Sequence, residues 1–171
     1  NLMIIKQLID EDFVNYKKPS MFIAFPTCSW KCEKECGEKV CQNGTLATSP
    51  NIEVSMKSIV DRYLNNKITK SIVMGGLEPF DSSHDMYQLI GYFREFTNDD
   101  IVIYTGYTKD EIERLGEEEL GRGMIFNLLK YTGKNNIIIK FGRFIPNQEK
   151  HYDEVLGVYL ASPNQYAERI C

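Results

Sequence analysis

The sequence predicts an α/β protein with a mainly parallel sheet. Four short apolar segments have the composition of strands covered on both faces, because their hydrophobic residues run on rather than alternate with polar ones. Segments with the helical spacing of apolar residues lie between them. Alternation of strand and helix is typical of right-handed βαβ units. From the residues alone, the sheet is either open or curled as part of a barrel.

Each of the four strand segments ends in small or turn-forming residues, as strands commonly do. The N-terminal segment "LMIIKQLI" predicts an added strand or hairpin, and residues 153–162 predict a short strand on the sheet edge. The four main segments are "MFIAFPT" (21–27), "SIVMGG" (71–76), "DIVIYTG" (100–106) and "NIIIKFG" (136–142).

Three segments between the strands predict helices. Residues 55–66 begin at Ser55, a favourable N-cap, and residues 82–97 place apolar side chains along one side. Residues 108–120 open on Thr108, and acidic residues in the first turn complement the helix dipole.

Length and composition limit the class of protein. At 171 residues with 43% hydrophobic content, the chain predicts one globular domain, residues 1–171. The net charge of -4 argues against nucleic acid and anionic membrane surfaces as partners, since both favour a basic face. No apolar run reaches the roughly 18 to 20 residues of a membrane-spanning helix. We therefore expect a cytoplasmic protein.

Polar and small residues follow the predicted strands where a ligand is expected. In parallel α/β folds, ligands gather at the carboxyl ends of the strands. The first strand leads into Cys28, the second ends in "GGLEP" with Gly75, Gly76 and Glu78, and the third ends in Tyr104 and Thr105. Taken alone, the glycine pair indicates no more than a tight turn, and the tyrosine and threonine are ordinary strand residues.

Four of the five cysteines, Cys28, Cys32, Cys36 and Cys41, stand in one loop. One helical turn would bring Cys28 and Cys32 to about 5–6 Å between Cβ atoms. A straight helix would separate Cys28 from Cys36 by about 12 Å, which favours Cys41 as the third ligand. A loop that is not helical would present Cys36 equally well.

The spacing also bears on the metal. Structural zinc sites usually pair cysteines as C-x2-C and close four ligands, and this loop has no such pair. Three thiolates with an open fourth position are typical of an iron-sulfur cluster that binds a further molecule. A cysteine-rich zinc domain without catalytic activity is the alternative.

Together, the cysteine loop, "GGLEP" and "VIYTGYT" resemble the radical S-adenosylmethionine superfamily, and more narrowly its activating proteins of anaerobic ribonucleoside-triphosphate reductase. The tail "FGRFIPNQ…LGVYLASPNQ" is similar to their terminal region. The resemblance implies an incomplete (βα) barrel, a [4Fe-4S] cluster and S-adenosyl-L-methionine as cofactors.

The resemblance also implies roles for single residues. The cluster ligands match Cys28 and Cys32, and "CQN" matches the third at Cys41, with Cys36 as the rival. Cofactor contacts match Gly75, Gly76, Glu78, Tyr104, Thr105 and Asn43. The spacing C-x3-C-x8-C or C-x3-C-x3-C departs from the usual C-x3-C-x2-C, and Leu77 displaces the glutamate by one position.

The function implied is that of an oxidoreductase that works under anaerobic conditions. It reductively cleaves S-adenosylmethionine to a 5′-deoxyadenosyl radical and generates a glycyl radical on the reductase. The implied partners are the glycyl-radical subunit of the reductase and a flavodoxin-like or other low-potential electron donor. Because the tail carries "KFGRF" and "LASPNQY" where the activating proteins have an acidic turn, a different peptide or small molecule is the alternative target.

Overall fold

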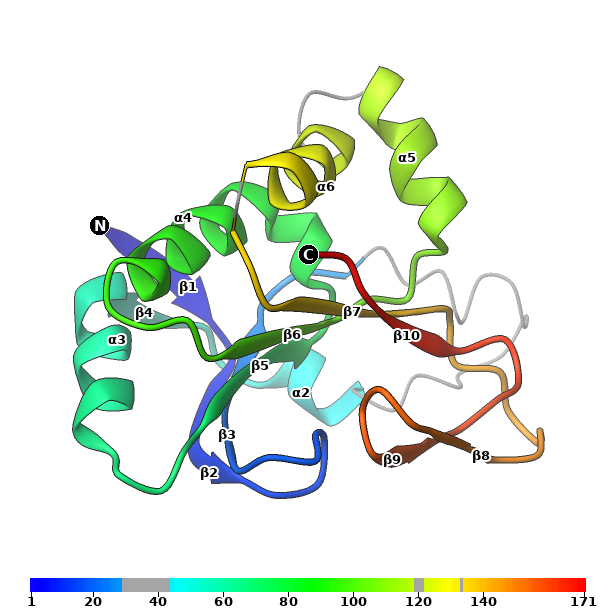
Figure 1. The fold of residues 1–171 in the computed structure, drawn as a ribbon, viewed down its shortest axis with the longest axis horizontal. Helices are drawn as coiled ribbons and strands as arrows, with labels where there is room; N and C mark the ends of the chain where they lie inside the picture. Colours follow the sequence, from blue (N-terminus) through cyan, green and yellow to red (C-terminus); the bar gives the residue numbers. More distant parts are fainter. Residues whose placement is uncertain (29–43, 119–121, 133) are drawn as a thin grey trace.

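A six-stranded sheet forms the centre of the computed structural model (Figure 1), which describes residues 1–28, 44–118, 122–132 and 134–171. The strand order is β10-β7-β6-β5-β3-β2. The four inner strands are parallel to one another, and an antiparallel strand flanks them at each edge. The strands of this sheet are β2 (Gln7–Asp12), β3 (Ser20–Phe25), β5 (Ser71–Gly76), β6 (Asp100–Tyr104), β7 (Ile137–Phe141) and β10 (Tyr166–Arg169).

Two antiparallel strand pairs lie outside the main sheet, and helices connect its strands. The outer pairs are β1 (Leu2–Ile5) with β4 (Ile52–Ser55), and β8 (His151–Asp153) with β9 (Val158–Leu160). The helices are α2 (Gly44–Thr48), α3 (Met56–Asn65), the 3-10 helix η1 (Pro79–Ser82), α4 (Ser83–Arg94), α5 (Lys109–Glu118) and α6 (Arg122–Tyr131). No described helix has the length and apolar character that crossing a membrane requires.

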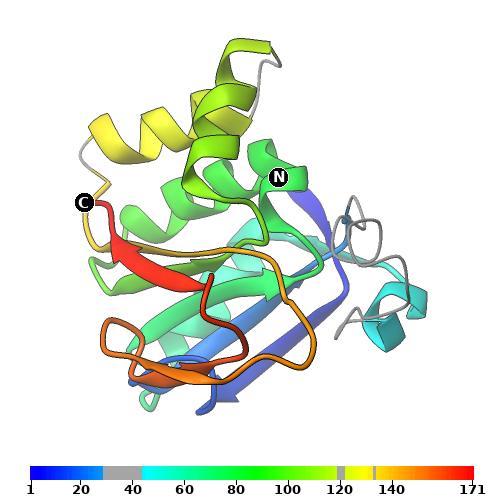
Figure 2. The ribbon, with the colours of Figure 1, turned by 90° about the vertical axis from the view of Figure 1, so that its right-hand side faces the viewer.

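The two faces of the sheet bury different partners. Successive strand residues point to opposite faces. On one face Ile137 and Ile139 pack with residues of α3, α4 and α6 in the larger hydrophobic cluster. On the other face Ile138 packs with Tyr16 and Leu156, from the β2–β3 connection and the β8–β9 turn. Figure 2 shows α4, α5 and α6 above the sheet, and the β8–β9 hairpin beside the β2–β3 connection below it.

All four predicted inner strands are present within one or two residues of their expected bounds. The caps of two helices are confirmed as well. The Ser55 side chain accepts a hydrogen bond from the Ser58 N–H at the start of α3 (3.1 Å). Thr108 Oγ1 accepts one from the Glu111 N–H, and the Glu111 carboxylate accepts one from the Thr108 N–H, which makes a capping box for α5.

The prediction for the N-terminal segment holds in one of its two forms. Strand β2 is the added strand, paired with β3 at the edge of the main sheet, whereas β1 pairs with β4 and so forms no hairpin with β2. The prediction near the other end of the chain needs correction. Residues 153–162 were expected to form the sheet-edge strand, but they fold back as part of the β8–β9 hairpin. The turn is closed by Asp153, whose side chain accepts the Leu156 N–H, and by Gly157 at φ +72°. The edge strand is β10 instead.

The main sheet runs from β10 at one edge to β2 at the other. The mixed α/β architecture therefore agrees with the sequence, and the incomplete barrel implied by the resemblance stays a prediction. Helix α6 was not predicted.

Candidate functional site

The described residues that were expected to bind a cofactor line one cavity of about 500 Å³. Its volume lies within the range of roughly 300–1,000 Å³ that is usual for small-molecule sites. A shallow depression over α4, lined by Arg94 and Lys134 among others, contains none of the predicted residues. The predicted residues on the cavity wall are Cys28, Gly75, Gly76, Glu78, Tyr104 and Thr105.

The two glycines at the end of β5 are required for different reasons. A Cβ at Gly75 would lie 3.0 Å from the Phe22 ring and 3.7 Å from Tyr104 Cβ, two side chains that line the cavity. Gly75 therefore keeps the cavity open. Gly76 has φ +82°, and a Cβ there would lie 2.6 Å from Ala24 Cα on the neighbouring strand. Gly76 therefore serves the close approach of β3 and β5.

The Glu78 carboxylate is a brace between two strand ends. It accepts hydrogen bonds from Thr105 Oγ1 (2.9 Å to each oxygen) and from the Gly106 N–H (2.8 Å). It also accepts one from the Phe80 N–H (3.0 Å), which caps η1. Burial raises the pKa of Glu78 to about 7, although the backbone donors act to lower it. Protein donors fix this side chain, and its contact with a cofactor stays a prediction.

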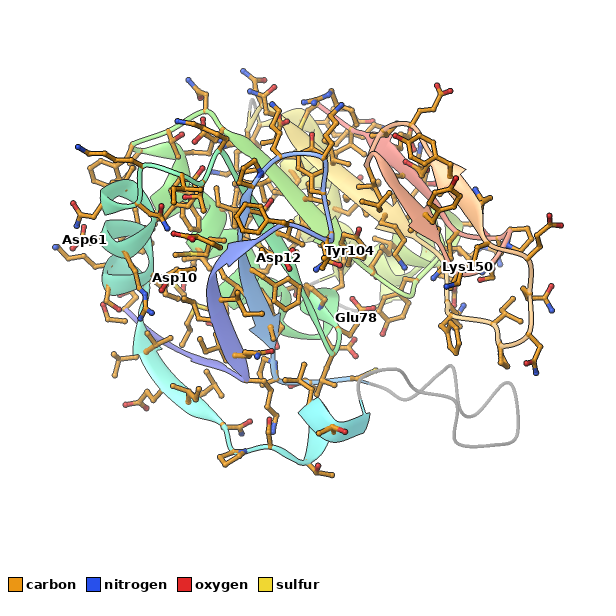
Figure 3. The ribbon with its side chains drawn as sticks, turned by 90° about the horizontal axis from the view of Figure 1, so that it is seen from below. Asp10, Asp12, Asp61, Glu78, Tyr104 and Lys150 are labelled. Carbon is orange, nitrogen blue, oxygen red and sulfur yellow. The ribbon has the colours of Figure 1, made fainter. Side chains whose placement is uncertain are left out.

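Tyr104 and Thr105 also have defined partners at the end of β6. The Tyr104 hydroxyl donates to the Asn15 carbonyl (2.5 Å) in the β2–β3 connection, and burial raises the pKa of that hydroxyl above its ordinary range. Thr105 Oγ1 donates to Glu78 and accepts from the Tyr107 N–H (3.0 Å). The Tyr104 ring is therefore a fixed wall of the cavity. Figure 3 shows Tyr104 and Glu78 near the middle of the molecule.

Cys28 is half-buried on the cavity wall, shortly after the end of β3. The backbone beside it is tied to the glycine segment, because the Glu78 N–H donates to the Thr27 carbonyl (2.7 Å). The first predicted cluster ligand is thus held next to the predicted cofactor segment. The other residues expected here, Cys32, Cys36, Cys41 and Asn43, lie outside the described residues.

The sequence analysis did not single out Lys140, which also lines the cavity. Lys140 Nζ donates to the Gly142 carbonyl (2.9 Å), and Gln165 Nε2 donates to the same oxygen (3.3 Å). Gln165 belongs to the "PNQ" run noted in the tail. The available signal was a lysine inside the otherwise apolar strand "NIIIKFG", which is unusual for a buried position.

The β8–β9 hairpin contributes a further part of the wall that was not predicted, through residues 158–161. This part depends on the packing of Leu156 and Leu160 beside Tyr16, far away in the sequence. Local sequence patterns contain no information on such a contact.

The structure is that of an α/β protein whose parallel strands carry a cysteine and two glycines at their carboxyl ends, beside the cavity, and ligands of such folds usually bind at that edge of the sheet. The chain belongs to the 4Fe-4S single cluster domain family, whose model matches residues 19–151. The matched range includes the cysteine loop and all the predicted cofactor residues. Comparison with curated proteins and with solved structures gave no match. The family therefore assigns a 4Fe-4S cluster domain to this chain.

Proposed function

We propose that this protein is a radical S-adenosylmethionine enzyme that generates a glycyl radical on an anaerobic ribonucleoside-triphosphate reductase. One observation carries the proposal: residues from three strand ends, expected from the sequence to meet the cofactors, line a single cavity in a chain of the 4Fe-4S single cluster domain family. The "GGLEP" and "YTGYT" segments support the narrower assignment to the reductase activating proteins.

The described residues fit such a cofactor. Cys28 offers a thiolate at the cavity wall, and thiolates are the usual ligands of iron-sulfur clusters. The missing side chain at Gly75 leaves space between Phe22 and Tyr104. Peptide groups can approach a ligand closely there. The hydrogen bond from the Gly106 N–H to the Glu78 carboxylate holds this segment close to the end of β6.

Cys28 and Cys32, with Cys41 or Cys36 as the third ligand, would hold the cluster. A bound [4Fe-4S] cluster, reduced by a low-potential electron donor, would supply the one electron for reductive cleavage of S-adenosylmethionine, and the hydrogen atom would be taken from the target. The protein's own part is to bind, orient and exclude water. The rings of Phe22 and Tyr104 form an apolar part of the cavity wall and would reduce the access of water to a bound cofactor.

A different peptide or small molecule is the second candidate target. The sequence "KFGRF" favours this target, because Lys140 and Arg143 stand where the activating proteins have an acidic turn. Lys140 also lines the cavity. The two candidate functions use the same cluster and the same cofactor, and they differ in the molecule from which the hydrogen atom is taken.

Anaerobic reconstitution with iron and sulfide tests the proposal. We expect about four iron atoms per chain, the visible absorption of thiolate-bound iron, and 5′-deoxyadenosine after addition of dithionite and S-adenosylmethionine. A protein that holds zinc and no iron would contradict the proposal and select the zinc domain. Cleavage of S-adenosylmethionine without a glycyl-radical signal in the reductase would select the second target.

The ligand set is tested by replacing each cysteine in turn with alanine. We expect loss of the cluster for Cys28→Ala and Cys32→Ala, and for one of the variants at Cys36 and Cys41. Cys171→Ala is the matched control. The Cys171 thiol donates to the Lys134 carbonyl (2.9 Å), away from the cavity lining, so this variant should retain its iron. Full iron content in Cys28→Ala would overturn the assignment.

A further inference from the structure

Strand β9 (Val158–Leu160) has an unpaired edge on the side of the cavity. Within the described part of the chain, the sheet of β8 and β9 has no third strand, so β9 pairs along one edge only. Four consecutive residues, 158–161, line the cavity, and no residue of β8 (His151–Asp153) does. Because successive side chains of a strand point to opposite faces, such a consecutive run indicates that the cavity lies along the unpaired edge of β9.

The main-chain groups of Tyr159 point to this edge. The Gly157 N–H donates to the Asp153 carbonyl (2.8 Å) and closes the turn directly before the facing pair Asp153 and Val158, which is therefore the hydrogen-bonded pair. Pairs of the two kinds alternate in an antiparallel sheet, so Tyr159 and Tyr152 form a pair without main-chain hydrogen bonds to each other. Their rings are in contact, 5.4 Å between centroids, as the shorter spacing of such pairs allows.

The described residues leave these groups of Tyr159 available. Beyond the pairing of the hairpin itself, no hydrogen bond among the described residues involves the main chain of Tyr159. Unpaired N–H and C=O groups at an edge strand are a template for pairing with a further extended chain. Proteins commonly protect such an edge with charged side chains or proline, and the sequence "VYL" of β9 contains neither.

The surroundings of the edge fit a polypeptide. Main-chain donors and acceptors along a strand are complementary to those of another extended chain, and the pockets beside them accept its alternate side chains. Tyr159 and Val14, which belongs to the β2–β3 connection, are 69% and 73% exposed and both line the cavity. They offer apolar contact at the mouth of the cavity. The edge is also continuous with the cavity that we take as the reaction site.

We propose that the unpaired edge of β9 binds an extended segment of the target protein as an added strand. The segment converts the hairpin into a three-stranded sheet and hydrogen-bonds to the main chain of Tyr159. Every second side chain of the segment shares the face of Val158 and Leu160. That face packs with Phe22 and Tyr104, two residues of the cavity wall. The added strand therefore presents alternate residues to the side of the predicted cofactor contacts.

The inference rests on the proposed function in one respect, because it takes the molecule that loses the hydrogen atom to be a protein. It adds the surface that holds this protein and the conformation of the bound segment. The probes are the glycyl-radical subunit of the reductase and a short synthetic peptide that spans its radical glycine.

A scan of the peptide tests the main-chain contacts without altering the enzyme. Each amide of the peptide is methylated on nitrogen in turn, and binding to the wild-type chain is measured by fluorescence anisotropy. Over the bound stretch, we expect the affinity to fall by about 5-fold or more at every second position, because the N–H groups between them point away from β9. Equal losses at all positions, or no loss at any, would overturn the inference.

Tyr159→Pro tests the same contact from the side of the enzyme. Proline removes the N–H that points to the unpaired edge, and such a position tolerates proline because the pairing with β8 does not use that N–H. Tyr159→Val removes the ring and keeps the N–H, so Tyr159→Pro should bind the peptide about 5-fold or more weakly than Tyr159→Val. Tyr152→Pro makes the same change at the outer edge of β8 and should bind within about threefold of the wild type.

The glycyl radical separates this inference from the proposed function. If a folded Tyr159→Pro variant forms the radical on the subunit at the wild-type rate, the inference is overturned and the function stands. A chain that cleaves S-adenosylmethionine but binds neither probe also overturns the inference. A chain that binds the peptide with the period of two but yields no 5′-deoxyadenosine contradicts the proposed function and supports the inference. Self-association that Tyr159→Pro abolishes would assign the edge to a second copy and overturn the inference.

Discussion

Glu78 joins three parts of the site through one buried carboxylate. Its oxygens accept hydrogen bonds from the end of β6 and from the first turn of η1, and its own N–H donates to Thr27, next to Cys28. The sequence analysis expected this residue at the cofactor. The structure gives it a second role that explains why a carboxylate is needed at this position, because three backbone and side-chain donors converge there.

The raised pKa of Glu78 makes the stability depend on pH. Its pKa is about 7 in the folded chain, against an ordinary value of 4.5, so the folded state holds a proton that the unfolded state has lost. The resulting stabilisation is fully present below pH 4.5 and is lost as the pH rises through about 7. It corresponds to about 3 kcal/mol. The free energy of unfolding should be measured with denaturant for wild type and Glu78→Gln between pH 4.5 and 8. As the pH rises, the value for the wild type should fall relative to that of the variant. Parallel curves would contradict it.

Gly76 has a backbone that only glycine adopts without strain. Gly76→Ala should lower the free energy of unfolding by about 3 kcal/mol or more, because φ is +82° and the new methyl group would overlap Ala24. Gly91→Ala in α4 is the control, since the nearest atom to its Cβ is the flexible end of Lys134. It should be neutral or stabilise by up to about 1 kcal/mol. Equal unfolding midpoints for Gly76→Ala and wild type would contradict the expected strain.

The β8–β9 hairpin closes one side of the cavity and depends on Asp153. One oxygen of this buried carboxylate accepts the Leu156 N–H (2.9 Å), and the other accepts the Ala167 N–H of β10 (3.0 Å). A single side chain therefore fixes the turn of the hairpin and joins it to the edge of the main sheet. The segment "DEVLG" contains the turn residues, and for this reason the prediction of a short sheet-edge strand in residues 153–162 was wrong.

Asp153→Ala should destabilise the hairpin and the sheet edge together. The substitution leaves two buried N–H groups without their acceptor, which costs about 2–4 kcal/mol. Amide hydrogen exchange should become faster in β8, β9 and β10 and change little in β5. Glu154→Ala, at the exposed neighbouring position, is the control and should stay within about 0.5 kcal/mol of the wild type. Protection unchanged at Leu156 and Ala167 would refute this role.

At the scale of the whole molecule, the architecture results from the alternation of strands and helices along the chain. The inner strands were predictable because each is a continuous apolar run, and the site residues at their ends follow from the parallel arrangement. The edge strand β10 was not predictable, because it is the short polar segment "YAER" and its pairing with β7 is a tertiary contact. Lys140 was missed for the same reason: its importance depends on what covers that face of the sheet.

The larger hydrophobic cluster includes side chains from β1, the inner strands and the helices α3, α4 and α6. We therefore expect denaturant unfolding in one transition. The change in far-ultraviolet circular dichroism and the change in the near-ultraviolet signal of buried tyrosines, among them Tyr16 and Tyr63, should coincide. Two separated transitions would indicate that the β8–β9 side, which contacts Tyr16, unfolds independently.

The Gly142 carbonyl accepts hydrogen bonds from Lys140 and Gln165, which are distant in the sequence. Gly142 itself has φ +103°, and a Cβ there would lie 3.0 Å from the Asn164 carbonyl oxygen. The two hydrogen bonds connect these three positions. In an alignment of relatives, we expect the residue at 140 and the "PNQ" run to vary together. A lineage that changes the charge at 140 should show compensating replacements some twenty-five positions later in the sequence.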